Sequence, residues 1–163
     1  SVRKLHWHLT VAGGGPDADA YRDQARALGL LNRITFPGCV DRESTERLLR
    51  SADILTLPSY DEGMAMSVLE GISYGLCVIC TPVGSLPDVV ENDVSGVLVQ
   101  PGNVDELARA FADCINDSNL RSRLGAGAAR AFFQNFDVSR YPDRMQPIYL
   151  AAVAEAERGR KRI

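Results

Sequence analysis

ILTLPSYDEGMAMSVLEGISYGLCVIC, residues 54–80, decides the fold class. The stretch begins with a short apolar run, Ile54 to Leu57, continues into an amphipathic segment near Ala65 to Tyr74, and ends with a second apolar run, Val78 to Cys80. Short runs rich in Val, Ile and Leu are typical of the buried strands of a parallel sheet, and an amphipathic segment between two of them predicts a helical crossover. The stretch therefore predicts a strand–helix–strand unit, with Gly75 as the expected end of its helix.

The same alternation continues on both sides of this unit. Further short apolar runs predict strands at His8 to Ala12, Arg33 to Phe36 and Gly96 to Val99. Further amphipathic segments predict helices near Ala18 to Leu28, Ser44 to Ser51, Leu86 to Glu91, Asp105 to Asn116, Leu120 to Gln134 and Asp143 to Glu157, with Asn103 as the N-cap of the Asp105 helix. The expected fold class is α/β: a doubly wound parallel sheet with additional C-terminal helices.

Length, composition and charge narrow the possible functions. The 163 residues fit a single domain, 1–163, and are too few for two Rossmann-like domains; the basic segment 158–163 is expected to be a flexible tail. A net charge of −3 provides no field to gather nucleic acid, and no apolar run approaches the roughly 20 residues of a membrane helix. The first residues lack the apolar core of a signal peptide, so we expect a cytoplasmic protein, with contact with the inner face of the membrane left open.

The four cysteines do not predict a disulfide scaffold or a metal site. Cys77 and Cys80 lie three positions apart on one predicted strand, so their side chains point to opposite faces. Cys39 and Cys114 add no second paired motif. The thiols are therefore interpreted as reduced, and no metal is expected.

A glycine-rich turn, VAGGGPD at residues 11–17, follows the first predicted strand and opens a helix. Gly13 and Gly15 would let a ligand approach the backbone closely. Together with Ala18 they satisfy the G-x-G-x-x-A pattern, but a dinucleotide site also requires an acidic residue at the end of the next strand, which here ends in Phe36-Pro37-Gly38. A purely structural tight turn remains the alternative.

Two glutamates eight positions apart flank a second candidate site. Glu62 lies in the loop after the Ile54 strand, where open α/β sheets bind ligands, and Glu70 lies about two turns further on, on the helix. One carboxylate can accept hydrogen bonds from both hydroxyls of a vicinal diol, as found in ribose and hexoses. A helix start also offers backbone N–H donors to a sugar or diphosphate, here at Gly63, Met64, Ala65 and Met66.

Purely structural interpretations of these two glutamates, without a ligand, remain open. A carboxylate near a helix N-terminus is stabilised by the helix dipole alone, which would account for Glu62. Glu70 could be a solvated residue on an exposed helix face, although its apolar neighbours Val68, Leu69 and Ile72 favour a paired, partly buried role.

The run from Ala52 to Gly75 resembles the E-x7-E signature of glycosyltransferase family 4, also called group 1, whose members have the two-domain GT-B architecture. The similarity extends from Leu9 to about Phe136, and its further matches are the turn Gly13 to Pro16, the strand end Ile34 to Gly38, and the segments Thr81 to Gly84, Leu86 to Val90 and Ser95 to Val99. The resemblance implies that the chain is the Rossmann-like half of a GT-B fold. It also implies a retaining transferase that moves a sugar from a nucleoside-diphosphate sugar to an acceptor. It implies no tightly bound cofactor or metal, with the nucleotide sugar as donor substrate.

The same resemblance implies residue roles. Glu62 would be the catalytic-site residue that contacts hydroxyls of the transferred sugar, and Glu70 would hold the ribose. The amides of Gly63 to Met66, with Gly13 and Gly15, would meet the sugar or the diphosphate. The loop containing Cys39 and Val40 would border the base.

The sequence also departs from the family pattern. Asp88 and Ser85 stand where glutamate and a second glycine are common. Both are expected to be tolerated, and whether Ser85 alters a turn near the sugar is left open. The family's first strand of this domain and its clamping Arg and Lys should precede Leu9, and Arg3 and Lys4 do not match them. We therefore expect a gap or a repaired sheet between the Leu9 and Ile54 strands, a marginally stable or self-associating chain, and an inactive fragment that lacks its N-terminal acceptor-binding domain.

Three alternatives remain. A nucleotide-sugar-binding module without turnover would retain the same residues. A GT-B-type sugar-nucleotide epimerase would share the architecture but not the E-x7-E arrangement. A flavodoxin-like domain would explain the alternation of strands and helices but not the spaced glutamates.

Overall fold

A computed structural model describes residues 5–160 as an α/β structure in which every paired strand is parallel. The strands are β1 (Leu9–Ala12), β2 (Ile34–Gly38), β3 (Ile54–Leu57), β4 (Cys77–Cys80) and β5 (Val97–Leu98). The helices are α1 (Ala18–Ala27), α2 (Arg42–Ser51), α3 (Met66–Ser73), α4 (Leu86–Val89), α5 (Val104–Asn116), α6 (Ser118–Asn135), the short 3-10 turn η2 (Val138–Arg140) and α7 (Tyr141–Arg160). The fold class and each predicted helix and strand are therefore confirmed, with ends that differ by a few residues.

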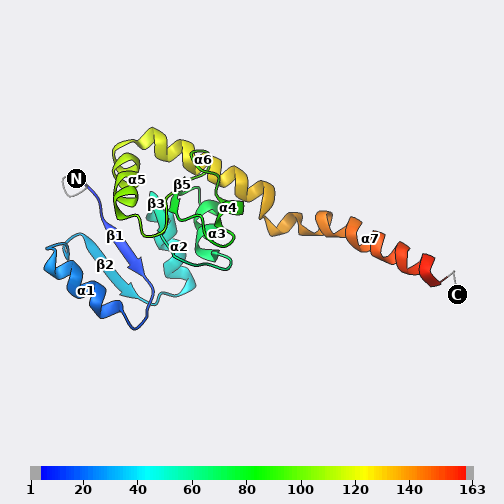
Figure 1. Cartoon of the computed structure of the whole chain (residues 1–163), viewed down its shortest axis with the longest axis horizontal. Coiled ribbons are helices and arrows are strands. Elements are labelled where there is room, and N and C mark those ends of the chain that lie inside the picture. Colours follow the sequence, from blue (N-terminus) through cyan, green and yellow to red (C-terminus); the bar gives the residue numbers. More distant parts are fainter. Residues whose placement is uncertain (1–4, 161–163) are drawn as a thin grey trace.

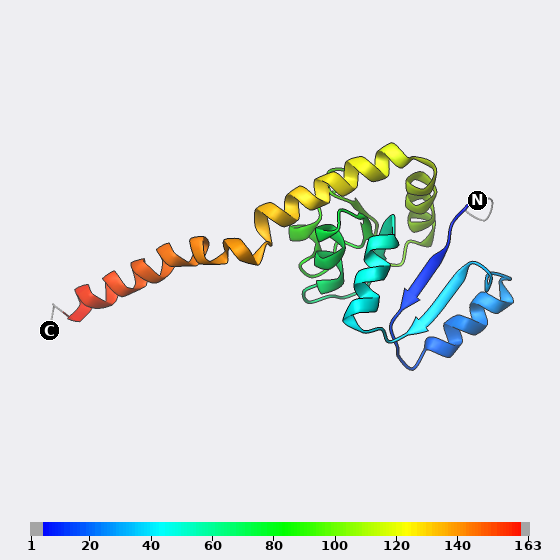
Figure 2. The same ribbon diagram turned by 180° about the vertical axis from the view of Figure 1, so that it is seen from behind.

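The strands form two separate sheets rather than one. β1 pairs only with β2, and β3, β4 and β5 form a second sheet in that order. Figures 1 and 2 show β1, β2 and α1 standing apart from the rest of the molecule. Among residues 5–160, β1 and β3 thus each keep one edge without a strand partner. Of the two outcomes expected for the sheet, the structure has the gap and not the repair.

β4 is the centre of the core. All four of its residues are buried, and alternate side chains enter two apolar clusters. Val78 and Cys80 pack with residues of α3 and α4, whereas Cys77 and Ile79 pack with residues of α5 and α6. Helices therefore cover both faces of this sheet, as the doubly wound pattern predicts, and Cys77 and Cys80 lie on opposite faces.

Predicted helix ends are confirmed where a local interaction fixes them. The Asn103 side chain accepts a hydrogen bond from the Glu106 amide at 3.1 Å and caps α5. Gly75 follows α3 with a φ of 72°, a left-handed conformation that only glycine adopts without strain. α6 also crosses close to Gly75: a Cβ on Gly125 would lie 2.1 Å from the Gly75 carbonyl oxygen. Both glycines are therefore required for α6 to pack against α3 and β4.

The C-terminal helix α7 extends away from the body of the molecule (Figure 1). It continues through Arg160, so three residues of the expected tail, 158–160, are helical, and residues 161–163 lie outside the described residues. Residues 1–4, with Arg3 and Lys4, also lie outside them. Within residues 5–160, every helix is too short or too polar to cross a lipid bilayer.

Candidate functional site

The loop between β3 and α3 lies at the carboxyl end of β3 and is fixed by the neighbouring loop between β4 and α4. The Thr81 hydroxyl donates to the Ser59 carbonyl at 2.6 Å, and the Ser85 amide donates to the Gly63 carbonyl at 3.2 Å. Between them, Gly84 packs so closely that a Cβ there would lie 1.8 Å from the Glu62 carbonyl oxygen. Because β3 and β4 are adjacent and parallel, their carboxyl ends bring these two loops together.

Ser85 does not distort this turn. Its φ of −83° is one that any residue adopts, so serine costs no backbone strain here. Serine is therefore tolerated at this position of the turn. The Ser85 hydroxyl oxygen is buried and has no hydrogen-bond partner within residues 5–160.

Glu62 is half-buried at the tip of the loop, and its side chain is held in place. The Ser59 hydroxyl donates to Glu62 Oε1 at 2.7 Å. Within residues 5–160 the other carboxylate oxygen, Oε2, has no hydrogen bond, so it is available to accept one from a ligand.

The start of α3 leaves backbone donors unpaired, three of them on exposed residues and one, that of Ala65, on a buried residue. Its N-cap residue, Ala65, provides no side-chain cap, and within residues 5–160 the N–H groups of Gly63, Met64, Ala65 and Ser67 make no hydrogen bond. Met66 differs, because its N–H donates to the Met64 carbonyl at 2.9 Å. Three of the four predicted amides are thus free. Ser67 carries a fourth free amide that was not predicted, although the first turn of any uncapped helix leaves such N–H groups unpaired.

Gly63 leaves the approach to these amides open. A Cβ at this position would meet nothing within 4 Å, and the side chains of Met64 and Met66 are largely exposed. The loop therefore presents a backbone surface without a bulky side chain over it. The helix dipole adds a partial positive charge at the same place, which suits an anionic group such as a diphosphate.

Glu70 is exposed and forms no ion pair within residues 5–160. The expected paired, partly buried role is therefore wrong. Helical geometry explains the difference: at about 100° per residue, Val68, Leu69 and Ile72 share one face of α3, and Glu70 projects from the opposite side. Its carboxylate is free to accept from a ligand.

The second group of predicted residues lies at the ends of β1 and β2. The Gly13 amide donates to the Gly38 carbonyl at 2.8 Å, and a Cβ on Gly14 would lie 2.7 Å from the Cys39 sulfur. The glycine turn with Gly15 and the segment Cys39–Val40 are therefore neighbours. Within residues 5–160 no hydrogen bond or ion pair joins this group to the Glu62 loop, because the two groups belong to different sheets.

Two clefts lie elsewhere on the molecule. One, of about 490 Å³, is lined by Arg50, Asp53, Tyr74 and Arg121 among others, and a second, of about 440 Å³, lies between α4 and α6. Neither is lined by Glu62 or Glu70. The first lies at the amino ends of β3 and β4, whereas open α/β sheets bind ligands at the carboxyl ends, so the Glu62 loop remains the candidate site. Within residues 5–160, no group of three or more His, Cys, Asp or Glu side chains is placed to hold a metal.

Known proteins share this fold and much of this sequence. A family model described as glycosyl transferases group 1 matches residues 2–131. The D-inositol 3-phosphate glycosyltransferase of Mycobacterium ulcerans is 30% identical over 174 residues, covering 99% of this chain and 36% of the relative. Glycogen synthase of Mycobacterium tuberculosis is 31% identical over 144 residues, covering 88% of this chain and 35% of the relative.

Solved structures of other proteins superpose on this chain. Anabaena HepE in complex with UDP-glucose superposes with a TM-score of 0.78 at 25% identity, over 88% of this chain and 41% of that one. The C-terminal domain of the group 1 glycosyl transferase LpcC from Francisella tularensis has a TM-score of 0.76 at 24% identity, over 84% and 74% of the two chains. The chain spans about a third of the length of the curated relatives that it matches. By family model, sequence and fold, it belongs to the group 1 glycosyl transferases, which have the GT-B fold.

Proposed function

We propose that this chain is the donor-binding part of a retaining glycosyltransferase, which transfers a sugar from a nucleoside-diphosphate sugar to an acceptor. The observation that carries the proposal is the uncapped start of α3, where unpaired amides of Gly63, Met64, Ala65 and Ser67 adjoin the oriented carboxylate of Glu62. These groups match the two parts of such a donor. Amides suit a diphosphate, and a carboxylate suits sugar hydroxyls.

Each group has a distinct task in the proposed reaction. Glu62 accepts hydrogen bonds from hydroxyls of the transferred sugar, and Ser59 holds it in position. As the bond to the anomeric carbon breaks, negative charge develops on the departing diphosphate, and fixed amide dipoles stabilise that charge without having to reorganise. Glu70, free in the structure, grips the ribose hydroxyls. No tightly bound metal or cofactor takes part.

The donor site is completed by other parts of the protein. Gly13 and Gly15 contribute backbone near the diphosphate, and Cys39 and Val40 border the base, on the far side of the gap between the sheets. We further propose that an N-terminal acceptor-binding domain closes over this site and that the fragment alone does not turn over. The proposed location is the cytoplasm, with any membrane contact at its inner face, in keeping with four cysteines that form no disulfide.

Calorimetric titration tests the donor site. UDP, GDP and ADP, and their glucose conjugates, are titrated into the 163-residue chain, into Glu70→Ala, and into Glu155→Ala as an exposed control on α7. UDP-glucose is the first ligand to test, because HepE was solved with it. We expect saturable binding with one base, weakened about tenfold or more in Glu70→Ala, since a hydrogen bond to a charged group contributes about 1.5–3 kcal/mol. Equal binding by all three proteins would contradict the assignment.

A second candidate is a nucleotide-sugar-binding module without turnover. It would use the same uncapped start of α3 and the same oriented Glu62 carboxylate to hold the donor. The two candidates differ in one measurement. Release of nucleoside diphosphate from a bound nucleotide sugar, in the presence of acceptor and of the rest of the polypeptide, occurs only if the chain belongs to a working transferase.

A further inference from the structure

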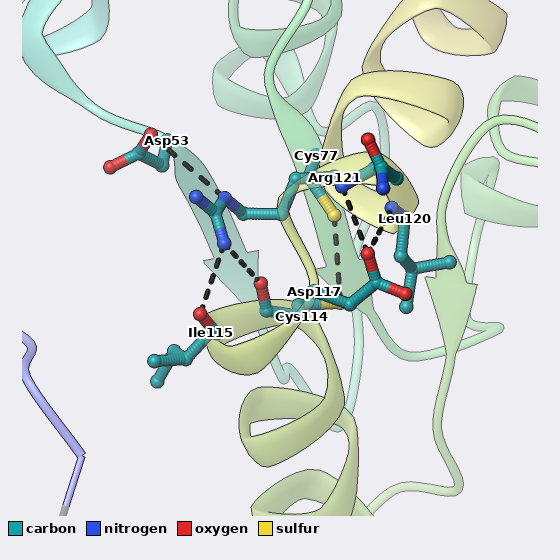
Figure 3. A network of polar contacts seen from close by, with 8 residues as sticks. Asp53, Cys77, Cys114, Ile115, Asp117, Leu120 and Arg121 are labelled. Atoms are coloured by element: carbon teal, nitrogen blue, oxygen red, sulfur yellow. Dashed lines mark hydrogen bonds and ion pairs between the residues drawn. The ribbon is translucent and has the colours of Figure 1, made fainter.

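Two buried cysteines face each other between β4 and α5, at the opposite end of β4 from the candidate donor site. Cys77 is 1% exposed and Cys114 is 0% exposed, and their sulfur atoms are 3.7 Å apart. Figure 3 shows the two side chains pointing toward one another, with the Cys77 thiol donating a hydrogen bond to the Cys114 sulfur. A disulfide needs a separation of about 2.05 Å, so the two sulfur atoms have to approach one another by about 1.7 Å from this contact.

Arg121 links this pair to solvent. Its Nη1 donates to the carbonyl oxygens of Cys114, at 2.7 Å, and Ile115, at 3.1 Å, and its Nε lies 3.9 Å from Asp53 Oδ1 (Figure 3). The same arginine, together with Leu76, lines the cleft of about 490 Å³. The cleft therefore reaches Leu76, the residue directly before Cys77, and the guanidinium that holds the end of α5, but neither cysteine lines it.

The two thiols are not equivalent. The hydrogen bond from Cys77 lowers the pKa of Cys114, and the Arg121 guanidinium also favours its thiolate, while burial and the carboxylates of Asp113 and Asp117 oppose this. The same hydrogen bond, followed by burial, raises the pKa of Cys77. Because Arg121 is bonded to the Cys114 carbonyl and its charge favours a thiolate there, we assign Cys114 as the attacking thiol and Cys77 as the resolving one.

We propose that Cys77 and Cys114 form a redox modification site, which a small peroxide converts reversibly into a disulfide that joins β4 to α5. The Cys114 thiolate attacks one peroxide oxygen, so that an S–O bond forms, the O–O bond breaks, and hydroxide leaves and becomes water by taking up a proton. The Cys77 sulfur then attacks the sulfenic sulfur of Cys114. The S–S bond forms, the S–O bond breaks, and the oxygen leaves as the second water with the Cys77 proton. In total the two thiols lose two electrons, and one hydrogen peroxide is reduced to two waters.

The disulfide would be a covalent cross-link between β4 and α5 within the core. It links residues 37 positions apart in the chain, and closing a loop of that size restricts the unfolded state. We expect Tm to rise by about 5 °C or more on oxidation and to return on reduction. The β3–α3 and β4–α4 loops lie at the other end of β4, so the disulfide should leave them in place.

The test uses the 163-residue chain with Cys39→Ser, which removes the exposed thiol. The protein is treated with hydrogen peroxide, denatured, alkylated and mapped by mass spectrometry, with thermal unfolding in parallel. We expect a loss of about 2 Da, a peptide that joins Cys77 to Cys114, an alkylated Cys80, and recovery of all thiols with dithiothreitol. Cys80→Ala is the matched control, because Cys80 is equally buried on the opposite face of β4 and its variant should still form the bond. Cys114→Ala should form no bond and show no rise in Tm.

Two results would overturn the proposal. One is full alkylation of both Cys77 and Cys114 after a peroxide treatment that oxidises the exposed Cys39 of the unsubstituted chain. The other is a disulfide or a sulfinic acid at Cys80 in place of the Cys77–Cys114 bond. Neither depends on the folding of a variant at the site, because both are read on proteins that retain Cys77 and Cys114.

Discussion

Gly84→Ala should damage the Glu62 loop more than any other single methyl group added to its support. The new Cβ would lie 1.8 Å from the Glu62 carbonyl oxygen, so the two loops must move apart by at least about 1.2 Å to reach 3.0 Å, the closest approach that real Cβ atoms tolerate. Gly84 also has a φ of 54°, which costs an alanine roughly 1–2 kcal/mol. With about 1–3 kcal/mol for the overpacking, the total should lower Tm by about 5–15 °C.

Gly29→Ala is the matched control. Gly29 has a similar left-handed φ of 69°, but a Cβ there meets nothing within 4 Å, so this variant carries the backbone strain without the clash. We expect Gly29→Ala to lower Tm by about 2–6 °C and to bind nucleotide sugar normally, whereas Gly84→Ala should bind at least about tenfold more weakly, because it displaces the amides. Calorimetric titration and thermal unfolding provide both values. Equal Tm and equal affinity for the two variants would refute the claim that the β4–α4 loop fixes the site.

Three further predictions follow from the same structure. Leu124→Ala removes a fully buried side chain of α6 that packs with residues of β4 and α5, and it should lower the free energy of unfolding, measured with urea, by about 2–5 kcal/mol. A loss below about 1 kcal/mol would show that this cluster is loosely packed. Ser59→Ala removes the donor that orients Glu62 but keeps the carbonyl that binds Thr81, so nucleotide-sugar affinity should fall about fivefold with Tm almost unchanged; unchanged affinity would mean that the orientation of Glu62 is unimportant. The open edges of β1 and β3 should make the isolated chain marginally stable or self-associating in analytical ultracentrifugation, and a monomer with a highly stable, cooperative transition would argue against this.

Local patterns in the sequence were sufficient to predict the elements of the fold. The strand Ile54–Leu57, the capping side chain of Asn103 and the helix stop at Gly75 each depend on residues near in sequence, and all three are confirmed. β2 runs two residues further than expected, through Pro37 to Gly38. Proline lacks an N–H donor and usually ends a strand, but near the end of this strand it is tolerated.

Tertiary details of the site could not be predicted in this way. The supports of the Glu62 loop, Thr81 and Gly84, come from another crossover about 20 residues away, and only the pairing of β3 with β4 brings them near. The Met66 amide is occupied because the loop turns back onto Met64, which residue types do not specify. The exposure of Glu70 follows from helical angles alone, because its apolar neighbours Val68, Leu69 and Ile72 lie on the opposite side of α3.

The pairing of Cys77 with Cys114 shows the same limit. Strand alternation correctly places Cys77 and Cys80 on opposite faces of β4. Contact between Cys77 and Cys114 depends in addition on how α5 packs on the sheet, and the segment between the two cysteines carries no motif that predicts it.

Amide chemical shifts measured during a titration with UDP-glucose test the central claim most directly. With ¹⁵N-labelled chain, we predict saturable shifts at the free amides of Gly63, Met64, Ala65 and Ser67, reduced in Glu70→Ala, and no shift at Arg121 in the opposite cleft. Shifts confined to the Arg121 cleft, or none at the α3 amides of a demonstrably folded chain, would contradict the claim that this helix start receives the donor.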